Sequence, residues 1–466
     1  MNEAMLLNAS EWAIETFGSV ELGDPRRTDR AVQIASAMAV EPAASLPLQM
    51  GNASALQAAY RYLGNEAVSH AALQEPHWFH TRELAGQYQR VLLIQDTTDL
   101  NYSQHPKTSG LGPIGHGKRG QGFFLQTVVA VDPQTQEVLG LAYQEPFVRQ
   151  PAPKGETRAQ RRDRARESQV WQRAVQAIGA PPQLGQWIHV GDRYSDIFTF
   201  WQQCEQEQCA FVVRAAQDRR VQAGFPESGA EAEIQRLFDL TRALPPQGSR
   251  MKELPRLHER PARQAHLQIS FQAITLLPPK NGAALRKTPV RAWVVRVWEP
   301  ELAASAEPLE WVLVTSVPVE TLAAAWQCVD WYTMRWIIED FHQGLKTGCQ
   351  IEQRHLDSYE DLTRLVGLLA PLALRLLQIR ARARHAPDAP ATTVLPVEIV
   401  QVVALLDQRP TASLSADELW RTIARLGGYL GRKSDGPPGW KTLWRGWSRV
   451  QQVLEGVHLA LNFLSS

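Results

Sequence analysis

The sequence contains few cysteines, no marked excess of either charge and no long apolar run. Four cysteines in 466 residues are too few for a disulfide framework. With 49 Lys and Arg against 48 Asp and Glu, the formal net charge is +1, which neither demands nor excludes nucleic acid because a binding face needs only a local excess. The longest apolar stretch, at 365–374, is well short of the roughly 20 residues of a membrane span.

The first residues also lack a basic segment followed by an apolar one, so no secretory signal is expected. Apolar residues make up 44% and charged residues 21%, which is enough apolar surface for a sizeable core and too little charge for a disordered chain. At about 150 residues per domain, the length predicts roughly three domains. We therefore expect a cytoplasmic, multidomain protein without a membrane partner.

Three regions differ in their hydrophobic pattern. Residues 1–72 have helical spacing, and Asp24 before Pro25 is typical of a helix N-terminus. Residues 73–385 mix short apolar strands with helices, which predicts an α/β sheet with a β-rich segment at about 215–320. A linker at 384–390 precedes a helical remainder. The strands are expected at 91–94, 123–131, 138–143, 187–190, 211–213, 268–276, 290–297 and 311–315, and long helices at 321–346 and 362–383.

The most informative stretch is YTMRWIIEDFHQGLK, at 332–346. On a continuous helix, four of its polar side chains would lie within roughly a 60° arc of one face. A phenol, a guanidinium, a carboxylate and an amine on one face suit a site that binds a metal ion and phosphates together. The alternative is an exposed face with an Arg335–Glu339 pair, which would contribute little to the stability of the helix. The four residues are Tyr332, Arg335, Glu339 and Lys346.

Two aspartates add to this pattern, because each follows an apolar strand. Asp96 follows the strand at 91–94 and Asp192 follows the strand at 187–190. The ends of strands are where α/β sheets usually place ligands and chemistry. Together with Glu339, these carboxylates could hold two Mg²⁺ ions, the arrangement that promotes phosphodiester displacement. Taken singly, each aspartate could instead be a turn or cap residue.

Basic residues gather in three stretches despite the neutral total. Residues 149–167 contain seven basic and three acidic residues, residues 250–263 five and two, and residues 421–449 seven and one. Such runs are usually solvated faces, but three of them in one chain favour phosphate contacts, which dominate affinity for DNA.

Several motifs together resemble one family. They are GDPRRTDR at 23–30, AAYRYLGNEAVS at 58–69, IQDTTDL at 94–100, GDRYSDI at 191–197, FVVR at 211–214 and IARLGGYL at 423–430. The signature Y-x2-R-x3-E-x6-K is met without a gap at 332–346. Over nearly its whole length, the chain resembles the DDE transposases of bacterial insertion-sequence family four, the group of the composite kanamycin-resistance transposon.

The resemblance implies a fold and a metal site. It implies an α/β fold with a ribonuclease-H-like catalytic core and a β-strand insertion, flanked by N- and C-terminal helical domains. The domains would be a DNA-end-binding domain at 1–72, a catalytic domain at 73–385 and a dimerisation domain at 386–466. Asp96, Asp192 and Glu339 would bind the catalytic Mg²⁺, for which Mn²⁺ could substitute.

The resemblance also implies DNA contacts. Trp311 would stack on a base flipped out near the cleaved end, although it could instead be a core residue of its strand. Tyr332, Arg335 and Lys346 would grip the neighbouring phosphates, and Arg214 would be a further contact. One departure is Phe123-Phe124, where the family has a pair of tryptophans, and this puts the recognised terminal sequence in doubt.

The arginines after the Asp24 cap are a separate candidate for binding DNA ends. Arg26, Arg27 and Arg30 lie where helix-terminal N–H groups and side chains can meet phosphates, and the alternative is a solvated first turn.

The expected function is cut-and-paste transposition by a homodimer that pairs two transposon ends and joins them to target DNA. The expected location is the cytoplasm, at the nucleoid when bound to DNA. Two alternatives stay open: a structure-specific nuclease on the same fold, and a transposase-derived DNA-binding protein without catalysis.

Overall fold

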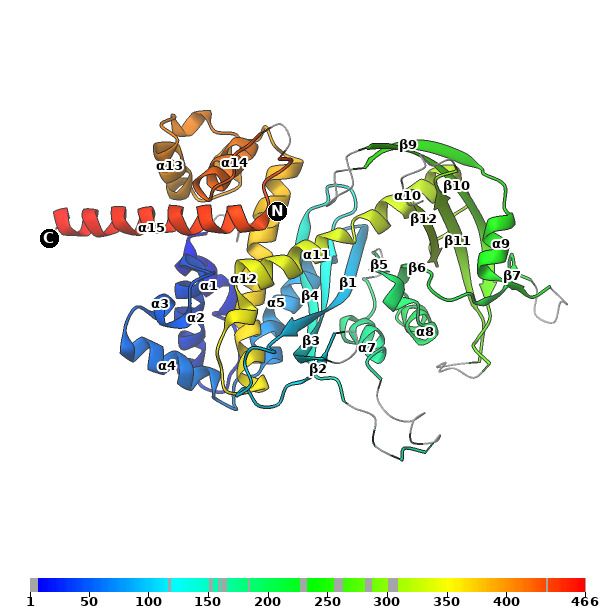
Figure 1. Cartoon of the computed structure of the whole chain (residues 1–466), viewed down its shortest axis with the longest axis horizontal. Helices are drawn as coiled ribbons and strands as arrows, with labels where there is room; N and C mark the ends of the chain where they lie inside the picture. The colour runs from blue at the N-terminus through cyan, green and yellow to red at the C-terminus, as the bar shows by residue number, and fades with distance from the viewer. Residues whose placement is uncertain are drawn as a thin grey trace. The chain divides into compact units, whose positions relative to one another are not determined.

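The chain folds into two compact units, each built from segments that are distant in sequence. The computed structural model describes residues 7–115, 119–150, 153, 155–157, 160, 166–182, 185–226, 233–254, 263–280, 287–300, 309–432 and 435–465. The first unit comprises Met1–Ala85, Thr97–Gln150 and Glu339–Ser466, and the second comprises Gly86–Asp96 and Pro151–Ile338. Strand β1 (Arg90–Asn101) and helix α11 (Trp336–Gln343) each run from one unit into the other (Figure 1).

The second unit has three parallel strands at its centre. Strand β1 pairs with β5 (Gln186–Gly191), and β5 pairs with β6 (Ala210–Arg214). Residues 91–94 are all buried, as expected of a strand covered on both faces. Helices α7 (Gln169–Ile178) and α8 (Phe198–Gln206) pack on one another, and α8 contacts β6. The strands predicted at 91–94, 187–190 and 211–213 are therefore confirmed.

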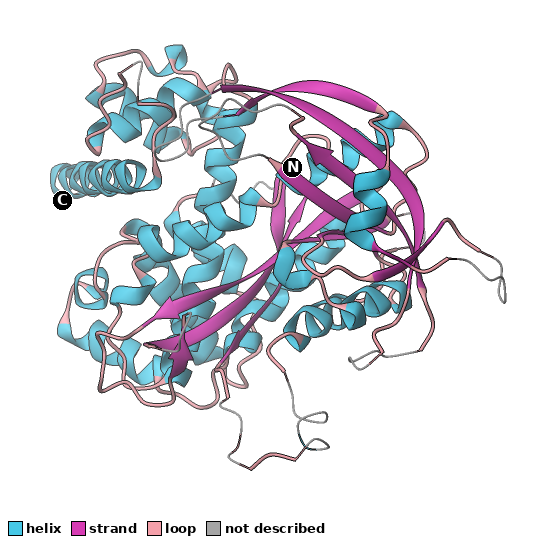
Figure 2. Ribbon diagram, turned by 45° about the vertical axis from the view of Figure 1, so that its right-hand side comes forward, coloured by secondary structure: helices cyan, strands magenta, loops and turns pink. Residues whose placement is uncertain are grey.

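An antiparallel layer continues from the parallel strands. Strand β6 pairs with β12 (Glu310–Thr315), and the order continues through β11, β10, β7 and β8, with β9 paired to β10. Its long strands are strongly curved (Figures 1 and 2). The β-rich segment predicted at 215–320 is confirmed, and it also contains helix α9 (Leu237–Ala243). The remaining strands are β7 (Arg220–Ala223), β8 (Gln235–Arg236), β9 (Gly248–Leu254), β10 (Arg263–Leu276) and β11 (Val290–Trp298).

The first unit has its own strands. In the sheet, β1 lies next to β3 (Gly120–Val131). Strand β3 also pairs antiparallel with β2 (Gly112–Ile114) and with β4 (Val138–Phe147). The predicted β3–β4 hairpin is confirmed. Its turn is held by the Asp132 carboxylate, which accepts hydrogen bonds from the Gln134 and Thr135 backbone N–H groups.

N-terminal helices pack on the long helix α12 (Tyr359–His385) in the first unit. The predicted cap is present, because the Asp24 carboxylate accepts from the Arg26 N–H at 2.9 Å. Buried Arg364 of α12 donates to the Leu63 and Val68 carbonyls at 2.8 and 2.6 Å, which ties α12 to the N-terminal region. These helices are α1 (Ala9–Phe17), α2 (Pro25–Val40), α3 (Leu46–Met50), α4 (Ala53–Leu63) and α5 (His70–Ala85).

Helix α12 is long and apolar enough to cross a membrane by length and composition alone. The apolar stretch of α12 is, however, entirely buried within the protein, as is typical of a helix in a protein core. After α12 come α13 (Val397–Leu406), α14 (Ala416–Leu426) and α15 (Trp440–Ser465). Most of the Arg-rich segment 149–167 and part of 250–263 lie outside the described residues.

Two predicted elements were wrong in detail. The helix expected at 321–346 is divided into α10 (Leu322–Thr333), α11 and a π-helical turn η3 (Gly344–Gly348). At the first break the Thr333 hydroxyl donates to the Asp330 carbonyl at 2.7 Å, a bond that competes with helix continuation. The single face proposed for 332–346 is therefore not that of one regular helix. Strand β1 also does not end at Asp96, because β-branched Thr97 and Thr98 continue it.

Candidate active site

Asp96, within β1, and Asp192, directly after β5, lie at matching positions beyond the paired part of two adjacent strands of the second unit. The parallel pairing of β1 with β5 ends at Ile94 and Val190, and each aspartate lies two residues further along. The expectation that both follow buried strand segments is met. The structure therefore brings these two carboxylates to one edge of the paired region.

An arginine accompanies the first of these carboxylates. The Arg335 guanidinium lies 3.6 Å from the Asp96 carboxylate, and their side chains are only 11% and 18% exposed. The Arg335 guanidinium also lies over the Trp336 ring at 5.3 Å. A mostly buried cation beside a carboxylate favours the ionised carboxylate, the form that binds metal ions.

The second carboxylate also shapes the local backbone. Asp192 caps the short 3₁₀ helix η2 (Arg193–Ser195), and its side chain accepts from the Tyr194 N–H at 2.8 Å. The cap alternative considered for this residue is thus part of its role.

Sequence reasoning missed Asp196, which organises the loop after β6. This buried carboxylate accepts from the Ala216 and Gln217 N–H groups, both at 2.7 Å, and from Arg219 Nε at 2.6 Å. These bonds fix the backbone just beyond Arg214, at the end of β6. The only sequence signal was the second aspartate of GDRYSDI.

Trp311, Tyr332 and Arg214 gather in the second unit. The Trp311 and Tyr332 rings meet edge-on, with centroids 5.0 Å apart. Burial raises the pKa of Tyr332, and Arg335 and Arg214 act in the opposite direction, the latter also through a hydrogen bond. Arg214 donates to the Glu310 carbonyl at 3.2 Å. A protonated phenol beside two cations and a partly exposed indole is an arrangement suited to a phosphate and a base.

Glu339 lies in the first turn of α11 and belongs to the first unit. Across the described residues, no three His, Cys, Asp or Glu side chains are grouped closely enough to hold a metal ion. The paired positions of Asp96 and Asp192 are what the structure supports, and Glu339 as a third ligand stays a prediction. Carboxylate oxygens are the donors that Mg²⁺ prefers, so the chemistry of the set fits that ion.

Lys346, the last residue of the signature, lies in η3 of the first unit. Its ammonium is 3.3 Å from the Asp99 carboxylate and 3.6 Å from that of Glu352. Glu352 also accepts from the Asn101 N–H at 2.8 Å. Neither acid was singled out from the sequence, because only tertiary structure brings 346 beside 99.

The three N-terminal arginines differ in their surroundings. Arg26 is 91% exposed and lies 3.4 Å from Asp24. Arg27 is half-buried and donates to the Leu22 carbonyl at 2.6 Å, while Arg30 is half-buried. Arg26 and Arg30 are thus better placed for a DNA backbone than Arg27, which has an internal partner.

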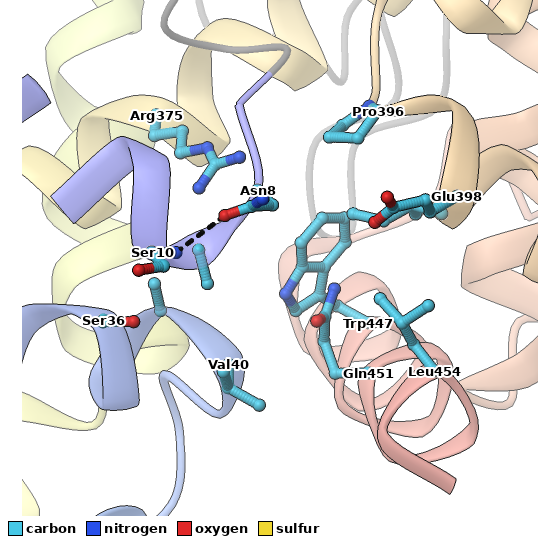
Figure 3. Close-up of a pocket in the computed structure, with 13 residues that line it drawn as sticks. Asn8, Ser10, Ser36, Val40, Arg375, Pro396, Glu398, Trp447, Gln451 and Leu454 are labelled. Carbon is cyan, nitrogen blue, oxygen red and sulfur yellow. Dashed lines mark hydrogen bonds between the residues drawn. The ribbon is translucent and has the colours of Figure 1, made fainter. Parts of the chain in front are cut away.

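A cavity of about 430 Å³ separates N-terminal from C-terminal helices within the first unit. Figure 3 shows Asn8, Ser10 and Val40 on one wall and Trp447 and Leu454 on the other. The one cation among its lining residues is Arg375, whose guanidinium donates to the Leu7 carbonyl. Burial lowers the pKa of Arg375 to about 10. A cavity with its cation already engaged offers little to a phosphate.

Two family models match the chain at its ends. The model described as transposase DNA-binding matches residues 9–68, which contain α1–α4. The model described as the transposase Tn5 dimerisation domain matches residues 372–465, which contain the end of α12 and α13–α15. The first supports DNA as a partner and the second supports a homodimer. Together with the signature at 332–346, these two matches support a Tn5-like transposase of insertion-sequence family four.

Proposed function

We propose that the protein is a DDE transposase that moves its insertion sequence by cut-and-paste transposition. The observation that carries the proposal is the matched placement of Asp96 and Asp192, each two residues beyond the end of the β1–β5 pairing, in a chain whose ends match transposase DNA-binding and dimerisation models. The parallel strands and the antiparallel extension support a ribonuclease-H-like core with a β-strand insertion.

The reaction would proceed through displacements at phosphorus. Water attacks the phosphodiester at the element's end and releases a 3′ hydroxyl. This hydroxyl attacks the opposite strand and forms a hairpin, which a second water opens. The regenerated 3′ hydroxyl then attacks target DNA. Each step exchanges one phosphodiester oxygen for another, so one site can serve all four.

Asp96, Asp192 and Glu339 would hold Mg²⁺, or Mn²⁺ in its place. When bound, two such ions activate the attacking oxygen and stabilise the leaving oxygen. Arg335, whose guanidinium lies 3.6 Å from the Asp96 carboxylate, would help to hold that carboxylate in place.

The chain's other residues would hold the DNA. Tyr332 and Arg335 donate hydrogen bonds to phosphate oxygens beside the scissile bond, with Arg214 next to them and Lys346 as a further cation. Trp311 offers a ring on which an unstacked base can lie, which would stabilise the strand distortion that a hairpin requires. Two transposon ends would be paired by a homodimer in the cytoplasm, at the nucleoid.

The test compares cleavage by the wild type with that by Asp96→Ala, Asp192→Ala and Glu339→Ala on duplexes carrying the element's inverted repeat. We expect each substitution to abolish Mg²⁺-dependent cleavage while end binding persists. Asp239→Ala is the matched control, because Asp239 is an exposed carboxylate on α9 of the second unit. Near-normal cleavage by Glu339→Ala would refute the third ligand.

The same assay separates the two alternatives. Cleavage by the wild type without joining to target DNA would indicate a nuclease. End binding without any cleavage would indicate a DNA-binding protein that has lost catalysis.

A further inference from the structure

A groove of about 930 Å³ lies beside the first turns of α15 in the first unit. Its cations are Lys441, Arg445 and Arg449, all exposed and spaced four residues apart. This spacing places the three side chains on one helix face. The groove is also lined by Ala43, Thr347, Gln350, Trp444, Ser448 and Gln452.

No carboxylate is among these lining residues. Within the described part of the chain, none of the three cations has an ion pair. The groove does have an acid near one end, because Gln452 donates to the Glu41 carboxylate at 3.0 Å. Elsewhere in the dimerisation domain three arginines are paired: Arg409 with Glu418, Arg421 with Asp417, and Arg425 with Asp407. The face of α15 thus differs from its neighbours in carrying uncompensated positive charge.

The position of this face relative to η3 is set by close packing. A Cβ atom on Gly348 would lie 2.0 Å from the Trp444 ring, so only glycine allows α15 to approach the turn this closely. The Trp440 and Trp444 rings stack at 6.0 Å. Because Trp444 is fixed against Gly348, the cationic face of α15 lies beside Thr347 and Gln350. Thr347 directly follows Lys346 in the sequence.

We propose that this groove binds the phosphate backbone of duplex DNA, an inference that rests on the proposed transposase function. The three cations span eight residues, or about 12 Å of helix. One DNA strand carries a phosphate about every 3.4 Å of axis, so the face covers about three to four phosphates. The amide and hydroxyl groups of Gln350, Thr347 and Ser448 add neutral donors of the kind that contact phosphates. The groove therefore extends DNA contact from the N-terminal region, through Ala43, to the turn that carries Lys346.

The experiment measures binding of the full chain to labelled duplex DNA, with a chelator present so that cleavage plays no part. The test variant is Lys441→Gln/Arg445→Gln/Arg449→Gln. Affinity is measured between about 50 and 200 mM salt, where each phosphate contact contributes about 0.9 to the slope of log affinity against log salt. We expect the triple variant to lower that slope by about 2 to 3.

Two further variants make the outcome decisive. Arg409→Gln/Arg421→Gln/Arg425→Gln removes the same charge from paired positions of the same domain and should leave the slope nearly unchanged. Lys441→Arg/Arg445→Lys/Arg449→Lys keeps the charge and should keep the slope. An equal loss in all three variants, or an unchanged slope in the first, overturns the proposal. So does dissociation of the dimer by the first variant in sedimentation, which would make the groove a protein contact.

The source of the DNA is resolved by using two duplexes. An effect on the inverted-repeat duplex assigns the groove to end DNA. An effect confined to an unrelated duplex, added after the ends are bound, assigns it to target DNA, and either result supports the groove. Failure of the proposed catalysis would appear separately, as wild-type protein that binds normally but does not cleave in Mg²⁺.

Discussion

Asp340, the residue after Glu339, forms a 2.7 Å ion pair with Arg380 of α12. Trp440 Nε1 donates to the same carboxylate at 3.3 Å, and the Arg380 guanidinium lies over the Trp440 ring at 4.5 Å. The helix that carries the predicted third ligand is therefore attached to the first turn of α15, within the segment that matches the dimerisation model. Residues from a different part of the sequence thus hold the helix on which Glu339 lies.

Replacing Asp340 with Ala should lower both stability and cleavage. Arg380 is 8% exposed and would lose its principal partner, which should reduce the free energy of unfolding by about 1–3 kcal/mol. Cleavage should slow roughly tenfold, the effect of about 1.4 kcal/mol on the barrier, if Glu339 loses its orientation. The measurements are urea unfolding and single-turnover cleavage at saturating DNA.

The control for Asp340 is Asp417→Ala. Asp417 lies 2.6 Å from Arg421, but both side chains are more than 40% exposed, so its loss should cost well under about 1 kcal/mol. A stability loss without any change in cleavage would show that Asp340 has no positioning role.

Replacing Trp311 with Ala should separate nicking from hairpin formation. Loss of a base stack costs about 1–3 kcal/mol, which corresponds to roughly 5- to 150-fold slower hairpin formation. Nicking needs only water and should change much less. A time course on end-labelled DNA resolves the two products on a denaturing gel. Equal slowing of both steps would point instead to the packing of Trp311 on Tyr332.

The N-terminal arginines should divide into two classes. Arg26→Gln and Arg30→Gln should each lower the salt slope of end binding by up to about 0.9. Arg27→Gln should mainly reduce stability, by about 1 kcal/mol, because its guanidinium donates to the Leu22 carbonyl. Anisotropy titrations and urea unfolding report the two effects. Identical behaviour of all three would contradict the division.

Acid should destabilise the second unit through His189. Burial lowers the pKa of His189 to about 3, from an ordinary value of 6.5, and its ring is hydrogen-bonded to Gln95 at 3.0 Å. The unfolded chain therefore binds a proton that the folded chain does not, so stability is full above pH 6.5 and declines as the pH falls towards 3.

At pH 5, proton binding by His189 in the unfolded chain lowers the free energy of unfolding by about 2 kcal/mol. His189→Gln should remove that share of the pH dependence in urea unfolding, whereas exposed His266→Gln should not. His70 and His77, whose pKa values burial lowers to about 4, contribute with the same sign. An unaltered pH dependence in His189→Gln would show that His189 binds its proton equally well in the folded and the unfolded protein.

Features with a local signal were predictable from the sequence. The Asp24 cap, the β3–β4 turn at Asp132 and the buried strand before Asp96 each depend on residues within a few positions of one another. The signature at 332–346, whose spacing indicated the family, is likewise contained in one short stretch of sequence. These signals were sufficient for the mixed α/β class and for the identity of the terminal domains.

Features with distant partners were not predictable. The π turn at the end of α11 contains Gly348, where the Trp444 ring packs too closely for a Cβ atom, and one partner of Lys346, Asp99, lies 247 residues away. Asp196 is recognisable as an organising residue only once Arg219 and the loop after β6 surround it. Periodicity alone therefore predicted one continuous helix where the structure has a break and a π turn.

The bonds from Arg364 to Leu63 and Val68 have a consequence during synthesis. The N-terminal helices leave the ribosome first, yet the guanidinium that satisfies the Leu63 carbonyl lies 301 residues downstream. At about 5–20 residues per second, that partner arrives about 15 to 60 seconds later. During this interval the nascent DNA-binding region lacks the helix on which it packs, so its final stability is acquired only as the last quarter of the chain emerges. A truncated protein ending before α12 should consequently be recovered with its N-terminal helices sensitive to protease.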